Sequence, residues 1–150
     1  MLRISVCLAT YNGEKYIREQ LDSVLNQLGE TDEVVVSDDN STDSTLDIVR
    51  SYRDDRIRIF VNNGPRGYSR NFENAILHAK NDILFLCDQD DVWTPDKKQV
   101  MLAALEEGYD LVVSDAEVVD AALNTIQASH FDVYGVKTGF WVNWAKTRYI

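Results

Sequence analysis

Residues 4–28 read ISVCLATYNGEKYIREQLDSVLNQL, and this stretch combines the two patterns that decide the fold. Its first part, Ile4–Ala9, is a short run of mainly apolar residues, which is typical of a strand covered on both faces. In its second part apolar side chains recur with the period of an α-helix, so Glu14–Gln27 is predicted to be an amphipathic helix. A buried strand followed directly by a helix is the repeating unit of a parallel α/β sheet.

The same alternation continues outward from this unit. Four more apolar runs are predicted to be strands, namely Val34–Ser37, Ile57–Val61, Ile83–Cys87 and Leu111–Ser114. Helical periodicity separates them around Leu46–Tyr52 and Phe72–Ala79. A fourth helix is expected to begin with Thr94 as N-cap and Pro95 in its first turn, and to end near Gly108 as a C-cap glycine. We therefore expect an α/β fold, a doubly wound and mostly parallel sheet with helices on both faces.

Composition limits the function. With 150 residues, 45% of them hydrophobic, the chain can bury one substantial core and is expected to form a single domain. Its net charge of -10 argues against binding to nucleic acid or to anionic membrane surfaces, which are recognised through clusters of Lys and Arg. Cys7 and Cys87 lie in apolar runs and are interpreted as buried small hydrophobic residues. Arg3 interrupts the opening of the chain, so no signal peptide is expected and a cytoplasmic location is the default.

Polar residues follow each predicted strand, at the end where ligands bind to parallel sheets. The loops read TYNG at 10–13, DDNSTD at 38–43, NNGPRG at 62–67 and DQDD at 88–91. In the last loop Asp88 and Asp90 are two apart on an extended chain, so both carboxylates can face one cleft. Such a pair suits Mg²⁺ or Mn²⁺ with ligand phosphates completing the coordination shell. A solvated acidic turn before the next helix is an equally good interpretation of these residues.

The loop at 38–43 and the arginines near the third predicted helix each have two interpretations. Capping of the following helix accounts for one or two of the polar residues after the second strand, and leaves Asp39 as an acceptor for a ligand donor group. Arg66 and Arg70 are surface residues on the simpler interpretation. A cation near a helix N-terminus is electrostatically unfavourable, however, and an anionic or aromatic ligand would account for it.

Taken together, the segments ISVCLATYNGEKYIREQLDSVLNQ, VVVSDDNSTDST and GYSRNFENAILHAKNDILFLCDQDDVW resemble glycosyltransferase family 2, whose members have the GT-A fold. The resemblance covers about residues 2–120. Within the family, the segments CDQDDVW and GYSRNFENAI are most similar to rhamnosyltransferase-like bacterial members. It implies a Rossmann-like domain that binds a nucleotide sugar with residues 1–120, and an acceptor-side region that begins at about 121 and is cut short at 150.

The resemblance also implies roles for particular residues. Ala9, Thr10 and Tyr11 would pack against the nucleotide base, Asp39 would accept a hydrogen bond from a pyrimidine ring nitrogen, and Arg70 would reach the nucleotide. Asp88 would serve the nucleotide and the metal ion, Asp90 would bind the metal, and Asp91 is an alternative ligand. The cofactor would be Mn²⁺ or Mg²⁺, bridging the diphosphate as a leaving group.

The implied activity is inverting transfer of a sugar, with rhamnose as one candidate, from a UDP- or dTDP-activated donor to a polysaccharide or lipid-linked glycan. The full-length protein would then work in the cytoplasm or at the inner face of the membrane. In the family the general base comes from the acceptor half, so it is expected beyond residue 150 and no catalytic residue is assigned. Aromatic residues from Phe131 onward lack a pattern, and a second copy of the chain is one partner that could cover them.

Two other classes of protein were weighed. A nucleotidyltransferase would need a glycine-rich, basic phosphate loop after the first strand, and TYNGEK is a thin match for one. A phosphoacceptor signalling module, which is a binding protein and not an enzyme, would need an acidic pair after the first strand, where Thr10 stands instead. It would also need a lysine after the fifth strand, where the sequence has Ser114-Asp115.

Overall fold

The computed structural model describes residues 2–135, and the chain divides into two compact units, Met1–Leu102 and a second that begins at Ala103. The first unit contains β1 (Ile4–Thr10), α1 (Ile17–Leu25), β2 (Glu33–Asp38), α2 (Thr45–Ser51), β3 (Ile57–Val61), α3 (Tyr68–His78) and β4 (Ile83–Asp88). Helix α4 (Lys97–Glu106) begins in this unit and continues into the second, which adds β5 (Val118–Val119), β6 (Thr125–Gln127) and α5 (His130–Tyr134).

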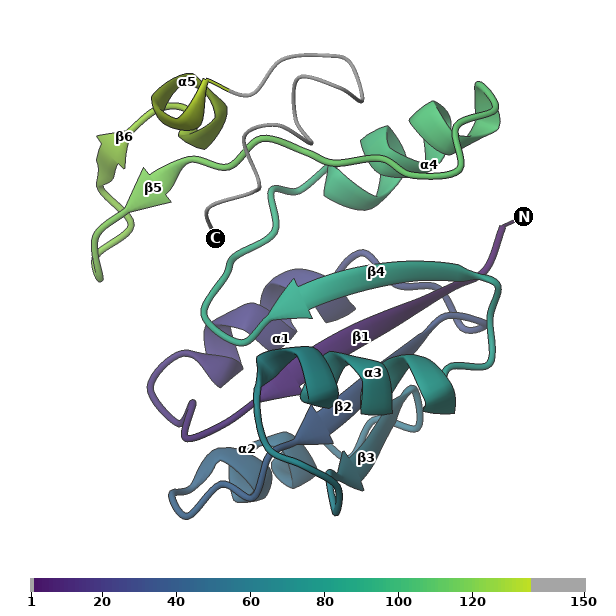
Figure 1. Cartoon of the computed structure of the whole chain (residues 1–150), viewed down its shortest axis with the longest axis vertical. Coiled ribbons are helices and arrows are strands. Elements are labelled where there is room, and N and C mark those ends of the chain that lie inside the picture. Colours follow the sequence, from purple (N-terminus) through teal and green to yellow (C-terminus); the bar gives the residue numbers. More distant parts are fainter. Residues whose placement is uncertain (1, 136–150) are drawn as a thin grey trace. The chain divides into compact units, whose positions relative to one another are not determined.

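Strands β1 to β4 form one parallel sheet in the order β3-β2-β1-β4 (Figure 1). The chain steps from β1 outward to β3 and then returns to the other side of β1. The strand order therefore reverses between β1 and β4. Parallel sheets commonly bind ligands at such a reversal, beyond the carboxyl ends of the strands. The predicted parallel α/β fold is confirmed in this sheet.

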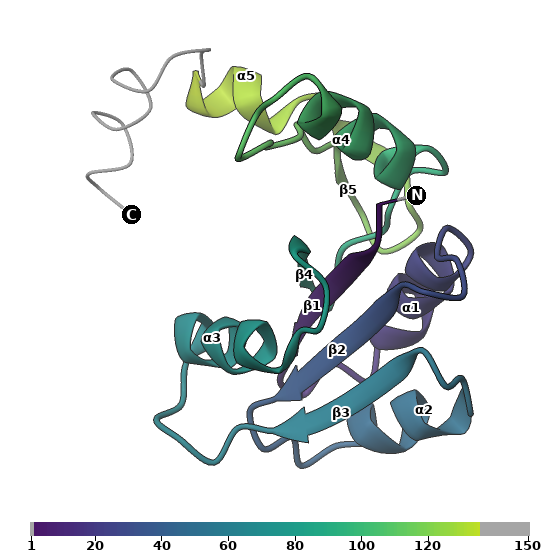
Figure 2. The ribbon, with the colours of Figure 1, turned by 90° about the vertical axis from the view of Figure 1, so that its right-hand side faces the viewer.

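Helices cover both faces of the sheet, with α1 and α2 on one face and α3 on the other (Figure 2). The larger core packs the α1 residues Ile17, Leu21 and Val24 against alternate residues of β1, β2 and β4. On the opposite face Ala75 of α3 packs against Cys7 and Val35. β1 and β2 are buried along their whole length because both of their faces are covered, which accounts for their mainly apolar sequences. Both cysteines are buried free thiols, as predicted.

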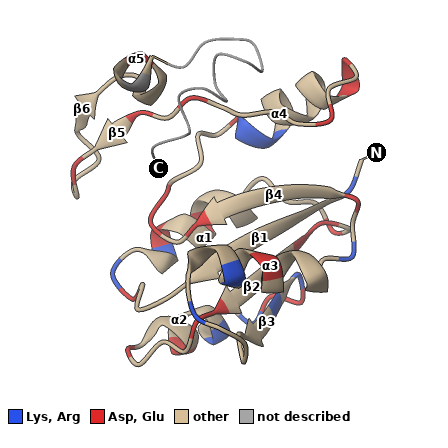
Figure 3. Cartoon of the chain, in the orientation of Figure 1, with Lys and Arg blue, Asp and Glu red and all other residues tan. Residues whose placement is uncertain are grey.

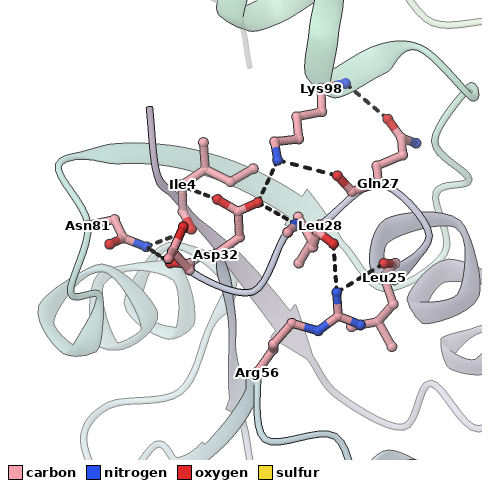
Figure 4. A network of polar contacts seen from close by, with 10 residues as sticks. Ile4, Leu25, Gln27, Leu28, Asp32, Arg56, Asn81 and Lys98 are labelled. Carbon is pink, nitrogen blue, oxygen red and sulfur yellow. Dashed lines mark hydrogen bonds and ion pairs between the residues drawn. The ribbon is translucent and has the colours of Figure 1, made fainter. Parts of the chain in front are cut away.

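A polar network closes the edge of the sheet where the strands begin, opposite to the strand ends that carry the polar loops (Figure 4). The Asp32 carboxylate accepts hydrogen bonds from the backbone N–H of Ile4 at 3.0 Å and of Gly29 at 2.8 Å, and forms an ion pair with Lys98 of α4. The Arg56 guanidinium donates to the carbonyl oxygens at the end of α1, including that of Leu28 at 2.7 Å. The ion pair attaches the start of α4 to the loop before β2, and the Arg56 bonds attach the residue before β3 to the end of α1 and the loop that follows it.

Two sequence predictions need correction. The segment Leu111–Ser114 is not a strand, and the second unit instead contains the antiparallel pair of β5 and β6. A strand needs a hydrogen-bonding neighbour, and the side chains of Leu111 and Val113 are 79% and 67% exposed, so they gain little from packing that would favour a strand. Helix α4 begins at Lys97 and not next to Thr94, because residues 94–97 form a turn in which the Lys97 N–H bonds to the Thr94 carbonyl.

The end of α4 agrees with prediction, since Gly108 has a φ of 98°, the positive value that favours glycine at the end of a helix. The expected division near residue 120 stays a prediction, while the first compact unit ends at Leu102. Among residues 2–135, every helix falls short of the length and apolar content needed to cross a bilayer.

Candidate nucleotide-binding site

A pocket of about 430 Å³ opens where β1, β2 and β4 end. Of the residues predicted for the site, it is lined by Ala9, Thr10, Tyr11, Asp39, Asp88 and Asp90. It is also lined by Arg66, Gly67, Tyr68, Asn71 and Gln89. All of these residues belong to the first compact unit. The strand register explains why these residues lie together at one edge of the sheet. Thr10 pairs with Asp38 on one side of β1, and Ala9 pairs with Asp88 on the other.

Side chains join the loops that follow β1 and β2. The Asn12 backbone N–H donates to the Ser41 hydroxyl at 2.9 Å, and the Asn12 side-chain oxygen accepts from the Thr42 N–H at 2.8 Å. Asn12 has a positive φ of 48°, a conformation that asparagine tolerates better than most residues. These bonds hold the two loops together next to the pocket, which Thr10, Tyr11 and Asp39 of the same loops line.

The two aspartates after β2 have different surroundings. Asp38 is fully buried, and its carboxylate accepts hydrogen bonds from the Thr10 hydroxyl at 2.9 Å and from the backbone N–H and hydroxyl of Ser41 at 2.8 and 2.6 Å. Its contacts with Ser41 lie within the turn and its contact with Thr10 joins the turn to the end of β1, so Asp38 stabilises the loop. The sequence argument that turn formation accounts for part of this acidic cluster holds for Asp38.

Asp39 is 7% exposed and lines the pocket. One carboxylate oxygen accepts from the Asn62 side-chain amide at 2.9 Å and the other from the Gly67 N–H at 2.8 Å. These bonds come from the loop before α3 and hold the carboxylate in one orientation. An ionised carboxylate offers about four acceptor positions, so two bonds leave capacity for a donor group of a ligand.

Asn71 and Gln89 connect the strand ends across the site, and neither was assigned a role from the sequence. The Asn71 amide donates to the Thr10 carbonyl at 3.0 Å and accepts from the Ser37 hydroxyl at 2.6 Å. The Gln89 side chain accepts from the Tyr11 N–H at 2.9 Å and donates to the Tyr11 carbonyl at 3.0 Å. On an extended strand Gln89 would face away from its neighbouring aspartates. β4 ends at Asp88, however, and the following turn brings Asp88, Gln89 and Asp90 to the same pocket.

The carboxylates after β4 repel one another. Partial desolvation and the nearby Asp90 charge raise the pKa of Asp88. Burial and both neighbouring carboxylates raise the pKa of Asp91, with Lys97 acting in the opposite direction. Asp91 is outside the pocket lining. Figure 3 shows this concentration of negative charge at the end of β4 and in the loop that follows.

Asp88 and Asp90 fit a divalent cation, because two pocket-facing carboxylates without a cationic partner among residues 2–135 gain from a positive charge placed between them. No group of three or more His, Cys, Asp or Glu side chains in the described part of the chain could hold a metal by itself. The remaining ligands would have to be oxygen atoms of a bound molecule or of water, which is how Mg²⁺ is commonly held.

The two arginines predicted near the site are separated by the fold. Arg66 lines the pocket, in the loop before α3. Arg70 is outside the lining, and its guanidinium pairs with Glu73 at 2.6 Å on the exposed face of α3. The role expected of Arg70 stays a prediction, and the lining adds Arg66 as the nearer cation.

In the second unit, the Asp115 carboxylate accepts from the Ser129 hydroxyl at 2.5 Å and from the Phe131 N–H at 2.8 Å. The side-chain bond from Ser129 and backbone bonds lower the pKa of Asp115. These contacts cap α5. The aromatic residues Phe140, Trp141, Trp144 and Tyr149, and the predicted position of the general base, lie outside the described residues.

Comparisons with known proteins place the chain in a family. The sequence profile described as "Glycosyl transferase family 2" matches residues 5–148. The chain is 37% identical over 116 residues to the poly(ribitol-phosphate) beta-N-acetylglucosaminyltransferase TarS of Staphylococcus aureus, covering 73% of this chain and 20% of TarS. It is 31% identical over 112 residues to a GalNAc(5)-diNAcBac-PP-undecaprenol beta-1,3-glucosyltransferase of Campylobacter jejuni, covering 73% of this chain and 36% of that protein.

Two solved structures extend the likeness to three dimensions. TarS residues 1–349 in complex with UDP align with a TM-score of 0.64 and 28% identity, over 83% of this chain and 43% of that one. The mannosyltransferase PcManGT of Pyrobaculum calidifontis, in complex with GDP-Man and Mn²⁺, aligns with a TM-score of 0.62 and 28% identity, over 79% of this chain and 36% of that one. The chain therefore spans less than half the length of each of these proteins. The expected likeness to rhamnosyltransferase-like members is not confirmed by these relatives.

Proposed function

Because the chain belongs to glycosyl transferase family 2, we propose that its first unit binds a UDP- or dTDP-activated sugar in the pocket at the ends of β1, β2 and β4. The base would lie beside Ala9, Thr10 and Tyr11, with its ring N–H donating to Asp39. The diphosphate would lie toward Asp88 and Asp90. The observation that carries this proposal is the oriented, nearly buried carboxylate of Asp39 in the same pocket as Asp88 and Asp90, which have no ion-pair partner within residues 2–135.

The electrostatics of the pocket require a cation for this arrangement. Asp88, Asp90 and a diphosphate are all negative, so their direct contact would be strongly unfavourable. Asp88 and Asp90 would hold a Mg²⁺ or Mn²⁺ ion, with Asp91 as an alternative ligand. Such an ion stabilises the negative charge on a departing diphosphate. Arg66 adds a positive charge on the side of α3, and Tyr68 adds an aromatic surface.

The full-length protein is proposed to transfer the sugar, with inversion, to a polysaccharide or lipid-linked glycan. Related proteins support this class of acceptor, since TarS is named for poly(ribitol-phosphate) and the Campylobacter protein for an undecaprenol-linked glycan. A lipid-linked acceptor would place the work at the inner face of a membrane. The candidate sugars are glucose and N-acetylglucosamine, for which the Campylobacter protein and TarS are named, and rhamnose, which the sequence resemblance implies.

The test is isothermal titration of the 150-residue chain with UDP, dTDP, GDP and ADP, each with Mn²⁺ and with EDTA. We expect UDP and dTDP to bind at least about tenfold more tightly with Mn²⁺ than with chelator, a difference of about 1.4 kcal/mol. We expect both to bind more tightly than ADP. Equal affinities with metal and chelator would contradict the metal site, and equal affinities for UDP and ADP would contradict base recognition by Asp39.

A further inference from the structure

The side chain of Gln89 connects the two halves of the pocket. Its amide accepts from the Tyr11 N–H at 2.9 Å and donates to the Tyr11 carbonyl at 3.0 Å, across 78 residues of sequence. β1 and β4 pair through their backbones as far as Ala9 and Asp88. Beyond this last pair, the Gln89 side-chain amide bonds to the Tyr11 backbone in the way that a strand's backbone amide would. Gln89 therefore joins the loop after β4 to the loop after β1.

Gly13 leaves the space that the Gln89 amide occupies. A Cβ atom built on Gly13 would lie 2.6 Å from Cδ of Gln89 and 3.2 Å from its Nε2, and no other residue provides one of its three nearest atoms. The φ of Gly13 is not among the positive values, so the constraint on this position is space and not backbone conformation. A side chain at position 13 would therefore displace Gln89 from Tyr11.

The far end of the loop after β4 is attached independently to α1. The Trp93 N–H donates to the Ser23 hydroxyl at 3.0 Å, and the Gln27 amide donates to the Thr94 carbonyl at 2.8 Å. Trp93 is also buried, against Phe85. The far end of the loop is held by these contacts. At the pocket end the loop is held by the bonds between Gln89 and Tyr11, and Gln89 lies between Asp88 and Asp90 in the sequence.

We propose that Gln89 is a positioning residue, which sets the distance between the base-binding loop at Ala9–Tyr11 and the carboxylates at Asp88 and Asp90. The base and the diphosphate of a nucleoside diphosphate are joined covalently through one ribose, so both can reach their partners at the same time only if the spacing of these two loops matches that span. This inference rests on the proposed function. It predicts that loss of the Gln89 side chain lowers the affinity for the whole nucleoside diphosphate more than the affinity for the nucleoside or for the diphosphate alone.

The experiment compares three probes on the 150-residue chain, namely uridine, pyrophosphate with Mn²⁺, and UDP with Mn²⁺. Affinities for the two part-ligands are measured by NMR titration and for UDP by calorimetry. In Gln89→Ala we expect UDP with Mn²⁺ to bind about tenfold more weakly, while uridine and pyrophosphate with Mn²⁺ each change less than about twofold. Gln99→Ala removes an exposed glutamine of α4 outside the pocket lining and should change none of the three.

A double-mutant cycle tests the contact directly. Gly13→Ala should weaken UDP binding by displacing the Gln89 amide, but should cost almost nothing in the Gln89→Ala background, where the added methyl group has space. Thermal unfolding of each variant checks that it folds. If Gln89→Ala does not fold, Gly13→Ala alone still tests the effect of displacing the Gln89 amide. Additive losses in the cycle would overturn the positioning role, as would a Gln89→Ala variant that binds all three probes like the parent.

Failure of the underlying function has a different signature. If the parent chain binds UDP no better with Mn²⁺ than with EDTA, the metal site itself is wrong and the inference falls with it. If the parent chain shows the metal effect and Gln89→Ala binds UDP with Mn²⁺ as tightly as the parent does, the nucleotide site stands and the role of Gln89 is wrong.

Discussion

Lys98 and Asp32 form an ion pair that is largely withdrawn from water, with side chains 17% and 3% exposed, and it attaches the start of α4 to the loop before β2 (Figure 4). The pair lies at the edge of the sheet opposite to the pocket. Asp32 also caps the beginning of β1 through the Ile4 N–H. One carboxylate therefore fixes three segments that are distant in sequence.

Loss of the cation should destabilise the protein strongly. In Lys98→Met the Asp32 carboxylate stays buried without its partner, and we expect the free energy of unfolding to fall by about 3–5 kcal/mol. Urea unfolding followed by circular dichroism measures the change. Arg50→Ala is the matched control, because its pair with Asp47 is exposed, and it should cost less than about 1 kcal/mol. Equal losses in the two variants would mean that burial of the Lys98 pair has no energetic importance.

The same carboxylate predicts a pH dependence. Burial acts to raise the pKa of Asp32, but the hydrogen bonds from Lys98, Ile4 and Gly29 outweigh it and lower the pKa from its usual 3.8. A carboxylate with a lowered folded-state pKa stabilises the fold above its unfolded-state pKa, and this contribution is lost as the pH falls through the folded-state pKa. The stability gap between the parent protein and Asp32→Asn should therefore be constant near neutral pH and narrow below about pH 4. A gap that stays constant down to pH 2.5 would contradict the shift.

Asp90→Ala tests the metal site. The substitution removes one of the two carboxylates expected to hold the ion, so the advantage of Mn²⁺ over EDTA in UDP binding should fall by at least about tenfold. Affinity in EDTA should change little or improve, because a repulsive charge is lost. Asp55→Ala removes an exposed carboxylate outside the pocket and is the control. A variant that keeps the full metal effect would exclude Asp90 as a ligand.

Asp39→Ala tests the selection of the base. An ionised carboxylate only accepts hydrogen bonds, so it favours bases that present a ring N–H, as uracil and thymine do. Removing a hydrogen bond to a charged group costs about 1.5–3 kcal/mol, and the loss should fall on UDP and dTDP but not on ADP. The informative quantity is the ratio of UDP to ADP affinity, with Asp47→Ala as the control. An unchanged ratio would show that Asp39 serves only Asn62 and Gly67.

The two arginines allow a direct comparison. Arg66 lines the pocket, whereas the Arg70 side chain is 60% exposed and pairs with Glu73, so Arg66→Ala should weaken UDP binding more than Arg70→Ala does. A difference of about 1 kcal/mol, or roughly fivefold, is expected between the variants. Calorimetry with Mn²⁺ present measures it. The reverse order would favour the role that the family resemblance gives to Arg70.

The strands β1 to β4 and the helix α1 could be predicted because the pattern of apolar residues within each segment indicates its secondary structure. The apolar runs of β1 to β4 and the apolar stripe of α1 are visible in the sequence, and the structure contains all of them, β3 with the predicted ends and the others with shifted ones. Leu111–Ser114 has the same apolar character and is not a strand, because pairing depends on a neighbour that the segment itself cannot specify. The β5 and β6 pair was missed since two- and three-residue strands carry almost no pattern.

For this protein the sequence alone determined the parallel α/β class, the position of acidic residues at strand ends, and Asp39 as the aspartate left over from turn formation. These features follow from periodicity and from the chemistry of neighbouring residues. The tertiary structure alone decided the order β3-β2-β1-β4, the presence of Arg66 and not Arg70 in the pocket lining, and the contact of Gln89 with Tyr11. Each of these depends on which distant segments the buried sheet brings together, because a hydrogen bond requires two groups to meet within about 3 Å and no local pattern records that meeting.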